Sequence, residues 1–495
     1  MPVNSEHPQY KIRKDQWRKC RHTIAGSDTI KKHTTEYLPP LAEQTDGEYH
    51  AYLSRALFYG ASSRTVQALM GAIFRKPYNV KYPEELEYQL ENITKDGKDL
   101  DTFVRDVVYE IISAGRVAIL PDALKLKENE TATTSNARPY LAVYTTEALI
   151  NWRTMLLEGE EQVIMAVLEE SYTEQKQNDE YELEVKTQYR VLRIGMEGRG
   201  QGARYQQDVY RKVRDKWVVV PELHAAPVRI GTPLTNIPLE IINTYDLTTD
   251  ADKPPLLDLI EVNLSHFRTS ADLEHGAHYT ALPTAWVAGF PKGSKLRIGS
   301  SSAWMTEETD AKAGFLEYTG KGLSTLQEIK RDKEQLMAIL GARLLEENKK
   351  AAEAADTLKI RAASETGSLT AMAKNISSGI TEALKTLAWW SGASDQQIEE
   401  IAFELNTDFI DTKLSPQEMQ ALMQLYQGGS ISQDTFLYNL KRGEVLPDDV
   451  TIDDEKDLIE MDEEQEPDMT NVTPFKRSFS VERDEQGQLV GVNEE

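Results

Sequence analysis

Three histidines in one short segment are the residues best placed for metal chemistry. They are His266, His275 and His278, and the last two share a helical face at a spacing of three, beside Glu274. Two imidazoles and a carboxylate could bind a metal ion. The segment has neither the HExxH pattern nor the spacing of a third ligand. Packing of a histidine-bearing helix end is therefore the favoured interpretation.

Another possible metal site lies toward the C-terminal end. Asn406 and Asp408 bracket Thr407, so on a strand both side chains would lie on one face. An amide and one carboxylate could begin a metal site, but Asn and Asp more often form turns. A turn is the favoured interpretation here.

Two glycine-containing segments come close to nucleotide-binding loops without matching them. Five residues separate Gly314 from Gly320, where the P-loop has four, and Gly322 stands where a Ser or Thr would bind Mg²⁺. The segment Gly198 to Gly202 lacks the preceding strand and following helix of a dinucleotide-binding fold. We therefore expect no cofactor.

The single cysteine, Cys20, excludes an internal disulfide and a thiolate metal cluster. It lies in the run Arg18-Lys19-Cys20-Arg21-His22, whose cations would lower the pKa of the thiol and favour reactivity. A lone residue is a weak signal, so an incidental thiol is the favoured interpretation.

The elements that would position these residues form an α+β pattern. Helical periodicity runs from Tyr49 to Phe74, with a break near Gly60, and again from Leu100 to Ala114. Extended segments dominate from Pro139 to about Thr244 and predict an antiparallel meander, with a helical patch at Thr146 to Trp152. Strand candidates are 117–120, 140–144, 162–168, 189–194 and 216–220.

Two helices of about twenty residues follow, and they enclose a compact extended segment. The first begins at Pro254-Pro255 and runs to about His275, because proline suits the first helical turn. The second begins near Ser324, where Ser-Thr-Leu-Gln fits a capping box. Between them, Tyr279 to Gly322 is rich in Pro, Gly, Ser and Trp, with strand-like pieces at 284–288 and 314–318. This plan is unusual for an enzyme.

One more long helix, a short strand, two short helices and an acidic tail complete the chain. The long helix runs from about Asp356 to Trp390, and the short helices lie between Ser415 and Gly443. From Pro447 to Glu495 there are 17 acidic and 4 basic residues, a net of −13 out of −25 for the whole chain. So few apolar residues accompany these charges that disorder is expected.

The composition indicates a core-forming protein, with 40% hydrophobic and 28% charged residues. No window approaches eighteen consecutive apolar residues, and the N-terminus lacks the pattern of a signal peptide. We therefore expect the protein to work inside a cell, or in a particle assembled there. The acidic balance argues against tight DNA binding, but it is compatible with a protein that surrounds DNA and lets it slide.

Basic residues occur only in small clusters. Acidic residues lie close to them, so they suit weak, distributed phosphate contacts, and solvated helix faces explain them about as well. The clusters are Lys292, Lys295 and Arg297, then Lys330, Arg331 and Lys333, then Lys349 and Lys350.

The order of these elements is similar to the wing, stem, clip, stem, wing and crown order of tailed-bacteriophage portal proteins. Individual segments resemble one portal-like phage family that is often described only as a domain of unknown function. The resemblance covers about Tyr37 to Gly443, and the order of the pieces carries most of its weight. The segments are Tyr37-Leu38-Pro39-Pro40, 52–77, 140–152, Leu273-Glu274-His275-Gly276, Leu282-Pro283-Thr284, Asn406-Thr407-Asp408-Phe409, 429–432 and 440–444.

The resemblance implies an elongated portal-type subunit of the α+β class. Its parts would be a mixed α/β wing (1–250), stem helix 1 (254–278), a small β-containing clip (279–322), stem helix 2 (323–345), a channel loop (346–355), a long wing helix (356–395), a helical crown (396–446) and a disordered acidic tail (447–495).

The resemblance further implies a non-enzymatic ring, typically of twelve identical subunits, at the unique capsid vertex of a virion assembled in the host cytoplasm. A docked terminase would pump double-stranded DNA through the channel, and the DNA would later leave the same way. Other partners would be head-completion or adaptor proteins and the major capsid and scaffolding proteins, with no membrane. The candidate residues are Lys330, Arg331, Lys333, Lys349 and Lys350 for the DNA channel, and Lys292, Lys295, Arg297 and Trp304 for clip contacts.

Two other functions stay open at this point. One is a metal-dependent hydrolase or nuclease that uses Asp408 or the His266 to His278 cluster. The other is an assembly scaffold that has the same helices but forms no channel. A ring with a central hole wide enough for a duplex would distinguish the portal from both.

Overall fold

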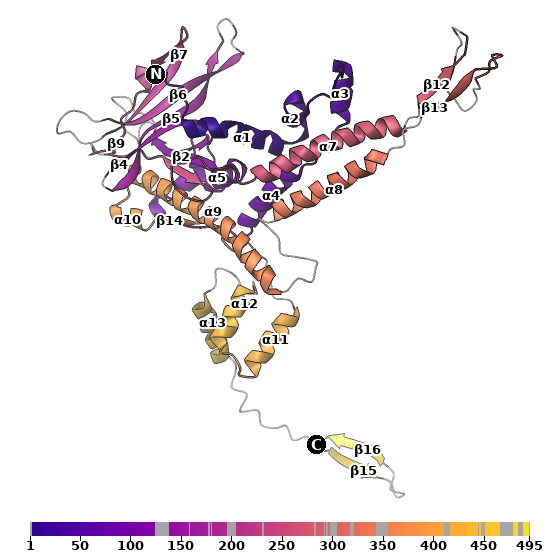
Figure 1. Ribbon diagram of the computed structural model, residues 1–495. Coiled ribbons are helices and arrows are strands. Elements are labelled where there is room, and N and C mark those ends of the chain that lie inside the picture. Colours follow the sequence, from indigo (N-terminus) through magenta and orange to yellow (C-terminus); the bar gives the residue numbers. More distant parts are fainter. Residues whose placement is uncertain are drawn as a thin grey trace. The chain divides into compact units, whose positions relative to one another are not determined.

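The computed structural model divides the chain into two compact units, Met1–Phe409 and Ile410–Glu495. Figure 1 shows the elements of both. The described residues are 2–123, 138–157, 159–176, 179, 181–195, 204–229, 232–281, 284–291, 293, 296–297, 304–316, 321–342, 355–409, 416–443, 445–446, 451–465, 479–483 and 489–494.

The first unit begins with helices that the sequence pattern revealed only in part. The break expected near Gly60 is present, because one helix ends at Arg55 and the next begins at Ala61. Asp99 caps the helix that starts at Leu100, and Gly115 ends it with a φ of 82°. The elements are α1 (Pro8–Ala25), α2 (Ser27–Lys32), the 3₁₀ turn η1 (Thr34–Glu36), α3 (Asp46–Arg55), α4 (Ala61–Ile73), β1 (Asn79–Lys81), η2 (Glu84–Asn92) and α5 (Leu100–Ala114).

Two antiparallel sheets occupy the middle of this unit. A three-stranded sheet has the order β11-β2-β3, and a five-stranded meander has the order β4-β5-β6-β7-β8. Their strands are β2 (Arg116–Ala123), β3 (Pro139–Thr145), β4 (Leu149–Leu157), β5 (Glu160–Gln175), β6 (Leu183–Gly195), β7 (Arg204–Val213), β8 (Lys216–Val219) and β11 (Glu240–Asn243). The short elements η3 (Pro221–Leu223), β9 (Val228–Arg229) and β10 (Thr232–Pro233) lie between β8 and β11.

The helical patch expected at Thr146 to Trp152 was wrong. Only a turn separates β3 from β4, and β4 already begins at Leu149. Trp152 is buried and pairs with Ala166 of β5. Pairing across the sheet therefore overrides the local pattern that suggested a helix.

Two hydrophobic clusters form the core of the first unit. One joins α3, α4, α5, α7 and α9 around side chains such as Phe103, Phe267 and Ile380. The other lies between the sheets and α1, where the ring of Trp17 is fully buried. The remaining elements of this unit are α7 (Leu257–Ala281), β12 (Thr284–Ala288), β13 (Lys312–Leu316), α8 (Lys321–Ala342), α9 (Ala355–Trp390), α10 (Asp395–Glu399) and β14 (Ala402–Glu404).

Helix α9 packs against β11 through a glycine. Gly379 is buried, and a Cβ atom added there would lie 2.5 Å from Ile242 Cγ1 and even nearer to Cδ1. Ile242 is itself fully buried and cannot move aside into solvent. The helix therefore approaches the sheet as closely as only a residue without a side chain allows.

Opposite stability changes are expected for Gly379→Ala and Gly71→Ala. The first overpacks the contact with Ile242 and should destabilise the protein by about 1–3 kcal/mol. The second fills open space on the exposed side of α4 and should stabilise it by about 0.5–1 kcal/mol, because alanine loses less backbone entropy on folding. Thermal unfolding of both variants checks this, and a stable Gly379→Ala would contradict the close approach.

The second unit contains short helices and one hairpin. The predicted helices between Ser415 and Gly443 are present as α11 (Pro416–Gln427) and α12 (Gln433–Arg442), the latter capped by Ser432. The predicted crown began at 396, but α10 and β14 belong to the first unit, where β14 pairs with β1.

The disorder expected for 447–495 was wrong for the described part of that segment. It contains α13 (Ile452–Gln465) and the antiparallel strands β15 (Phe479–Arg483) and β16 (Leu489–Glu494). Thr451 and Asp454 exchange hydrogen bonds at the start of α13, and Lys456 pairs with Asp434 of α12 at 2.7 Å. Local capping and this cross-helix ion pair support a helix that net charge alone disfavoured.

Candidate functional site: a helix pair with a terminal hairpin

The helices α7 and α8 run antiparallel and carry the β12–β13 hairpin beyond their shared end (Figure 1). Gly276 near the end of α7 faces Leu323 at the start of α8, where an added Cβ would lie 2.7 Å from Leu323 Cδ2. The second helix begins at Lys321 and not at the expected Ser324. The predicted plan of two long helices around an extended tip is therefore present.

Helix α7 is held by the N-terminal helices as well as by α8. The Tyr52 hydroxyl of α3 donates to Asp272 at 2.5 Å, and Ser62 of α4 donates to Asn263 at 2.9 Å. Asn263 in turn donates to the carbonyl of Tyr59 at 2.7 Å. These buried contacts make α7 the fixed member of the pair.

Two polar contacts join α8 to α7. The Lys333 ammonium donates to Thr269 Oγ1 at 2.6 Å and to the carbonyl of Ser265 at 3.2 Å. His266, which is fully buried, lies with Nε2 3.1 Å from Glu334 Oε1. Its Nδ1 has no hydrogen-bond partner among the described residues. His266 thus lies between α7 and α8 with only one of its two ring nitrogens in a hydrogen-bond contact.

The stability of the helix pair should fall as the pH drops below about 6.5, the ordinary pKa of histidine. Burial lowers the pKa of His266, and the pull of Glu334 only partly offsets it, while Lys330 and Lys333 lower it further. The unfolded chain therefore binds a proton that the folded chain rejects, and stability decreases by at most about 1.4 kcal/mol per pH unit. Melting temperatures between pH 7 and 5 measure this.

The matched variants for this pH effect are His266→Gln and His50→Gln. The first removes the buried titrating group and should flatten the part of the pH dependence that lies below 6.5. The second removes an exposed histidine of α3 and should leave that dependence unchanged. An unchanged profile in His266→Gln would assign the acid sensitivity to other groups.

One side of α8 exposes apolar side chains that no described residue covers. Met337 is buried against α7, whereas Ile329, Leu336 and Ile339 are 39%, 43% and 50% exposed. Their spacing of seven and three places them along one flank of the helix, beside the surface that packs on α7. We call Ile329, Leu336 and Ile339 the α8 stripe.

The hairpin is small and also exposes apolar rings. β12 and β13 pair from Thr284↔Leu316 to Ala288↔Lys312, and the indole of Trp286 covers Gly314, whose added Cβ would lie 3.1 Å from Nε1. Trp304 Nε1 donates to the carbonyl of Arg297 at 2.8 Å and so closes part of the connecting loop. The side chains of Trp286, Phe315 and Met305 are 43%, 56% and 87% exposed.

The described basic residues that were expected in the channel and in the clip have different surroundings. Lys333 is directed at α7, and Lys330 lies 3.8 Å from Glu334. Arg331 is exposed on α8, and Arg297 is exposed beside Trp304 in the hairpin loop. Lys292, Lys295, Lys349 and Lys350 lie outside the described residues, so their roles stay predictions.

The histidines considered for metal chemistry do not converge. His266 contacts Glu334, while His278 Nε2 lies 3.2 Å from Arg55 Nη2 of α3. The ring of His275 packs edge-on against Tyr52. The rings of His275 and His278 also both pack edge-on against Tyr279, so these two histidines share one aromatic neighbour.

Asp408 forms the turn that its residue type favoured. Its backbone N–H donates to Asn406 Oδ1 at 2.9 Å, and Asn406 Nδ2 donates to the carbonyl of Asp408 at the same distance. The carboxylate pairs with Arg75 at 3.0 Å and Lys76 at 3.2 Å. These residues fasten the end of the first unit to the end of α4.

The environment of Cys20 is the opposite of the one expected from its neighbours in sequence. The thiol is fully buried in α1, and burial raises its pKa to about 12 despite the adjacent Arg21 and Lys19. Arg21 is engaged instead with Glu110 and with Glu147, the latter at 2.9 Å. The thiol is therefore protonated at neutral pH.

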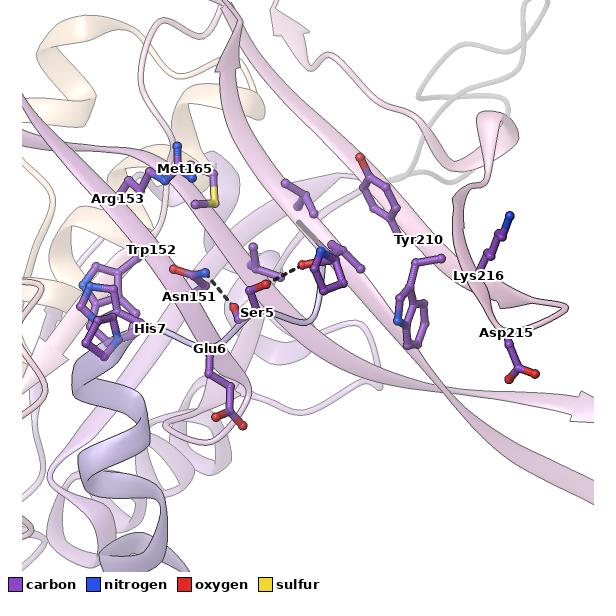
Figure 2. Close-up of a pocket in the computed structure, with 16 residues that line it drawn as sticks. Ser5, Glu6, His7, Asn151, Trp152, Arg153, Met165, Tyr210, Asp215 and Lys216 are labelled. Carbon is purple, nitrogen blue, oxygen red and sulfur yellow. Dashed lines mark hydrogen bonds between the residues drawn. The ribbon is translucent and has the colours of Figure 1, made fainter.

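A cavity of about 930 Å³ lies between the N-terminal segment and the five-stranded sheet (Figure 2). Asn151 donates to the carbonyl of Ser5 at 2.7 Å, and His7 stacks on Trp152 at 3.9 Å. Its other lining residues include Met165, Tyr210 and Trp217. The lining is mostly aromatic and apolar, and each of its two carboxylates has a cation beside it, since Glu6 pairs with Lys14 at 3.1 Å and Asp215 with Lys212 at 2.9 Å. The contacts pin the N-terminal segment to the sheet.

No helix in the described part of the chain combines the length and the apolar character needed to cross a membrane. A comparison with curated protein sequences gave no match. Residues 255–391 match a family model described as "Domain of unknown function (DUF4055)". The matched region begins just before α7 and ends just after α9, so it contains the helix pair and its hairpin as one block.

Several solved structures are similar to this chain at low sequence identity. A chain in the neck of the empty GTA particle, computed with C6 symmetry, has 14% identity and a TM-score of 0.37, with 81% of this chain and 95% of that chain covered. A chain in the virion of the native gene transfer agent particle has 12% identity and a TM-score of 0.37, with 82% of this chain and 96% of that chain covered. A chain in the neck of the native GTA particle, computed with C12 symmetry, has 14% identity and a TM-score of 0.36, with 78% of this chain and 92% of that chain covered. Such TM-scores do not establish a shared fold, so the assignment of function rests on the geometry of this chain.

Proposed function

We propose that the chain is the subunit of a ring-forming portal, a head–tail connector at one vertex of a phage-type capsid. The observation that carries the proposal is the antiparallel α7–α8 pair with a hairpin at its end and an uncovered apolar stripe on α8. In a ring, each pair would lie against the pair of the next subunit, and the hairpins would project together from one side.

Ring formation explains why the two helices differ in burial. Helix α7 contacts α1, α3, α4 and α8, whereas α8 packs mainly on α7 and α4 and leaves its stripe exposed. Repeated contact between two different surfaces of identical subunits closes a ring when the rotation between them is a whole fraction of a turn. The α8 stripe would be one of those surfaces, with a second copy of the chain as its occupant.

The charge of the chain suits a conduit for DNA. A net charge of −25 disfavours tight binding to phosphates, and tight binding would arrest a duplex that has to slide. Arg331, exposed on the side of α8 away from the stripe, is the described cation best placed for weak contact with passing DNA.

The hairpin would be the docking surface for the packaging motor and for head-completion proteins. Exposed aromatic and methionine side chains are enriched where proteins bind one another, and Trp286, Phe315 and Met305 are of these types. The proposal gives the subunit a structural role and no catalytic one.

Negative-stain imaging of the purified full chain tests the proposal. A ring with a central channel wide enough for duplex DNA is the expected result. A compact monomer or dimer at all concentrations would overturn it. A closed assembly without a central hole would instead favour the non-channel scaffold.

A further inference from the structure

The N-terminal helices bring two histidines and a glutamate together in a place that the proposed function does not use. His22 lies on α1, His33 ends α2, and Glu36 belongs to η1. Within the described residues, these three side chains are the one group whose His, Cys, Asp or Glu ligand atoms meet within 4.8 Å of one another. They come from three consecutive elements, and the turn at Gly26 folds the second element back on the first.

From this geometry we propose that His22, His33 and Glu36 form a binding site for a divalent transition metal ion of the zinc class. Two imidazoles and one carboxylate are a ligand set that zinc accepts, with water in the fourth position. The site would tie α1 to the segment that follows it.

The spacing of the ligand atoms supports this assignment. His33 Nδ1 lies 3.4 Å from Glu36 Oε2. Two atoms bound to one tetrahedral zinc at its usual bond lengths are about 3.4 Å apart. An ion could therefore enter between these two atoms with little change in their positions.

The partner of His22 suits a metal ligand as well. Tyr37 Oη lies 2.8 Å from His22 Nδ1. If this hydroxyl accepts the Nδ1 proton, Nε2 is left as a free acceptor, and ligating histidines usually have such a partner on their other nitrogen.

The two imidazoles lie next to each other. The rings of His22 and His33 stack with centroids 3.8 Å apart, so the end of α2 brings its histidine directly to the one on α1. Neutral imidazole is the form that binds metal.

Arg18 is the charged neighbour that opposes the metal. Its guanidinium contacts Glu36 Oε1 at 3.1 Å and Asp15 at 3.3 Å. Glu36 Oε2 remains directed at His33, so the carboxylate can bridge the guanidinium and the ion. Arg18→Gln should therefore strengthen metal binding.

The test is titration of tag-free full-length protein with Zn²⁺ by calorimetry and with Co²⁺ by visible absorption, at neutral pH. We expect one ion per chain and a Co²⁺ spectrum of four-coordinate type. His33→Gln and Glu36→Gln change exposed or half-exposed side chains, and each should weaken binding by more than about tenfold. His50→Gln, which removes an exposed histidine on α3, should bind as the wild type does.

The outcomes separate this proposal from the proposed function. Absence of stoichiometric binding, wild-type binding by His33→Gln or Glu36→Gln, or loss of binding in His50→Gln would each overturn the site. Far-ultraviolet circular dichroism and melting without metal show that the variants remain folded. Ring formation is scored separately, so a failure of one proposal leaves the other standing.

Discussion

Replacing Leu336 and Ile339 together by aspartate should abolish the ring while each chain stays folded. Both side chains belong to the α8 stripe and are 43% and 50% exposed in the single chain. They contribute little to the fold of the monomer, because the side of α8 that packs on α7 contains Met337 and not these two. In the ring, however, they would be covered by the next subunit.

The size of the effect follows from what each contact would lose. Burying one aliphatic side chain completely is worth about 1.5–3 kcal/mol, so covering two half-exposed ones contributes about 1.5–3 kcal/mol per interface. Two unpaired carboxylates at the same place would add a desolvation cost of several kcal/mol. Because the loss recurs at every interface of the ring, assembly should disappear at micromolar concentrations. Sedimentation velocity, with negative-stain imaging, measures this.

The matched control is Gln327→Asp with Ala338→Asp. It adds the same two charges to the same helix at exposed positions away from the stripe. This variant should still form rings. Wild-type assembly by Leu336→Asp/Ile339→Asp would place the subunit interface elsewhere, and loss of assembly in the control would show that added charge alone prevents it.

Local sequence signals predicted the elements that depend on local physics. The long helix α9 was predicted from Asp356 and begins at Ala355, because an unbroken apolar stripe marks one face of it. The helices α11 and α12 were predicted from a proline at the first position of the former and from glycines at the ends of both. The strand pieces of the hairpin were also predicted, and β12 matches its expected range.

Features that depend on packing between distant segments were missed. No helix was predicted before Tyr49, although α1 spans Pro8–Ala25. Its buried residues Tyr10, Trp17, Cys20 and Ile24 are spaced by seven, three and four, a helical signal that charged neighbours obscured. The same burial reversed the expectation for the pKa of Cys20. The neighbouring cations in the sequence suggested a lowered pKa, but the thiol is buried away from solvent and its pKa is raised.

The helix α8 shows why the candidate site could be predicted only in outline. The sequence pattern indicates a single apolar set that includes Leu326, Ile329, Leu336, Met337 and Leu340, and these positions span more than one face. The structure divides them between a buried face and the exposed stripe. It also directs Lys333 toward α7. Only the position of α7 decides between these faces, and nothing local to α8 records that position.

Replacing Arg190 by methionine should destabilise the five-stranded sheet by about 3–5 kcal/mol, the cost of leaving buried charges without their partner. Arg190 Nε donates to Glu170 at 2.7 Å, and Nη1 lies 3.4 Å from Asp122 and 2.7 Å from Gln207. The side chains of Arg190, Glu170 and Asp122 are 19%, 15% and 8% exposed. Methionine fills similar volume but leaves two carboxylates without their cation.

The pH dependence identifies the cause of this loss. Burial would raise the pKa of Glu170, but Arg190 and the hydrogen bonds from Tyr144 and Gln188 outweigh it and hold the pKa below its ordinary value. In the wild type, this stabilisation is present above about pH 4.5 and is lost as the pH falls through the lowered pKa. Without Arg190 the pKa of Glu170 should rise above its ordinary value. The variant then takes up a proton on folding, and its deficit should shrink between pH 7 and 5.

Hydrogen exchange of peptides from β6 measures both effects, with exchange expected to be about 150-fold to 5000-fold faster in Arg190→Met at pH 7. Lys186→Met is the control, since Lys186 lies four residues away on the same strand and pairs with Glu174 at an exposed position. It should exchange nearly as the wild type does. Adding Glu170→Gln and Asp122→Asn to Arg190→Met should restore part of the protection, because amides bury at lower cost than unpaired carboxylates. Equal exchange rates in Arg190→Met and Lys186→Met would contradict the prediction. They would mean that water solvates Glu170 and Asp122 in the folded protein, so that the loss of Arg190 leaves no buried charge unpaired.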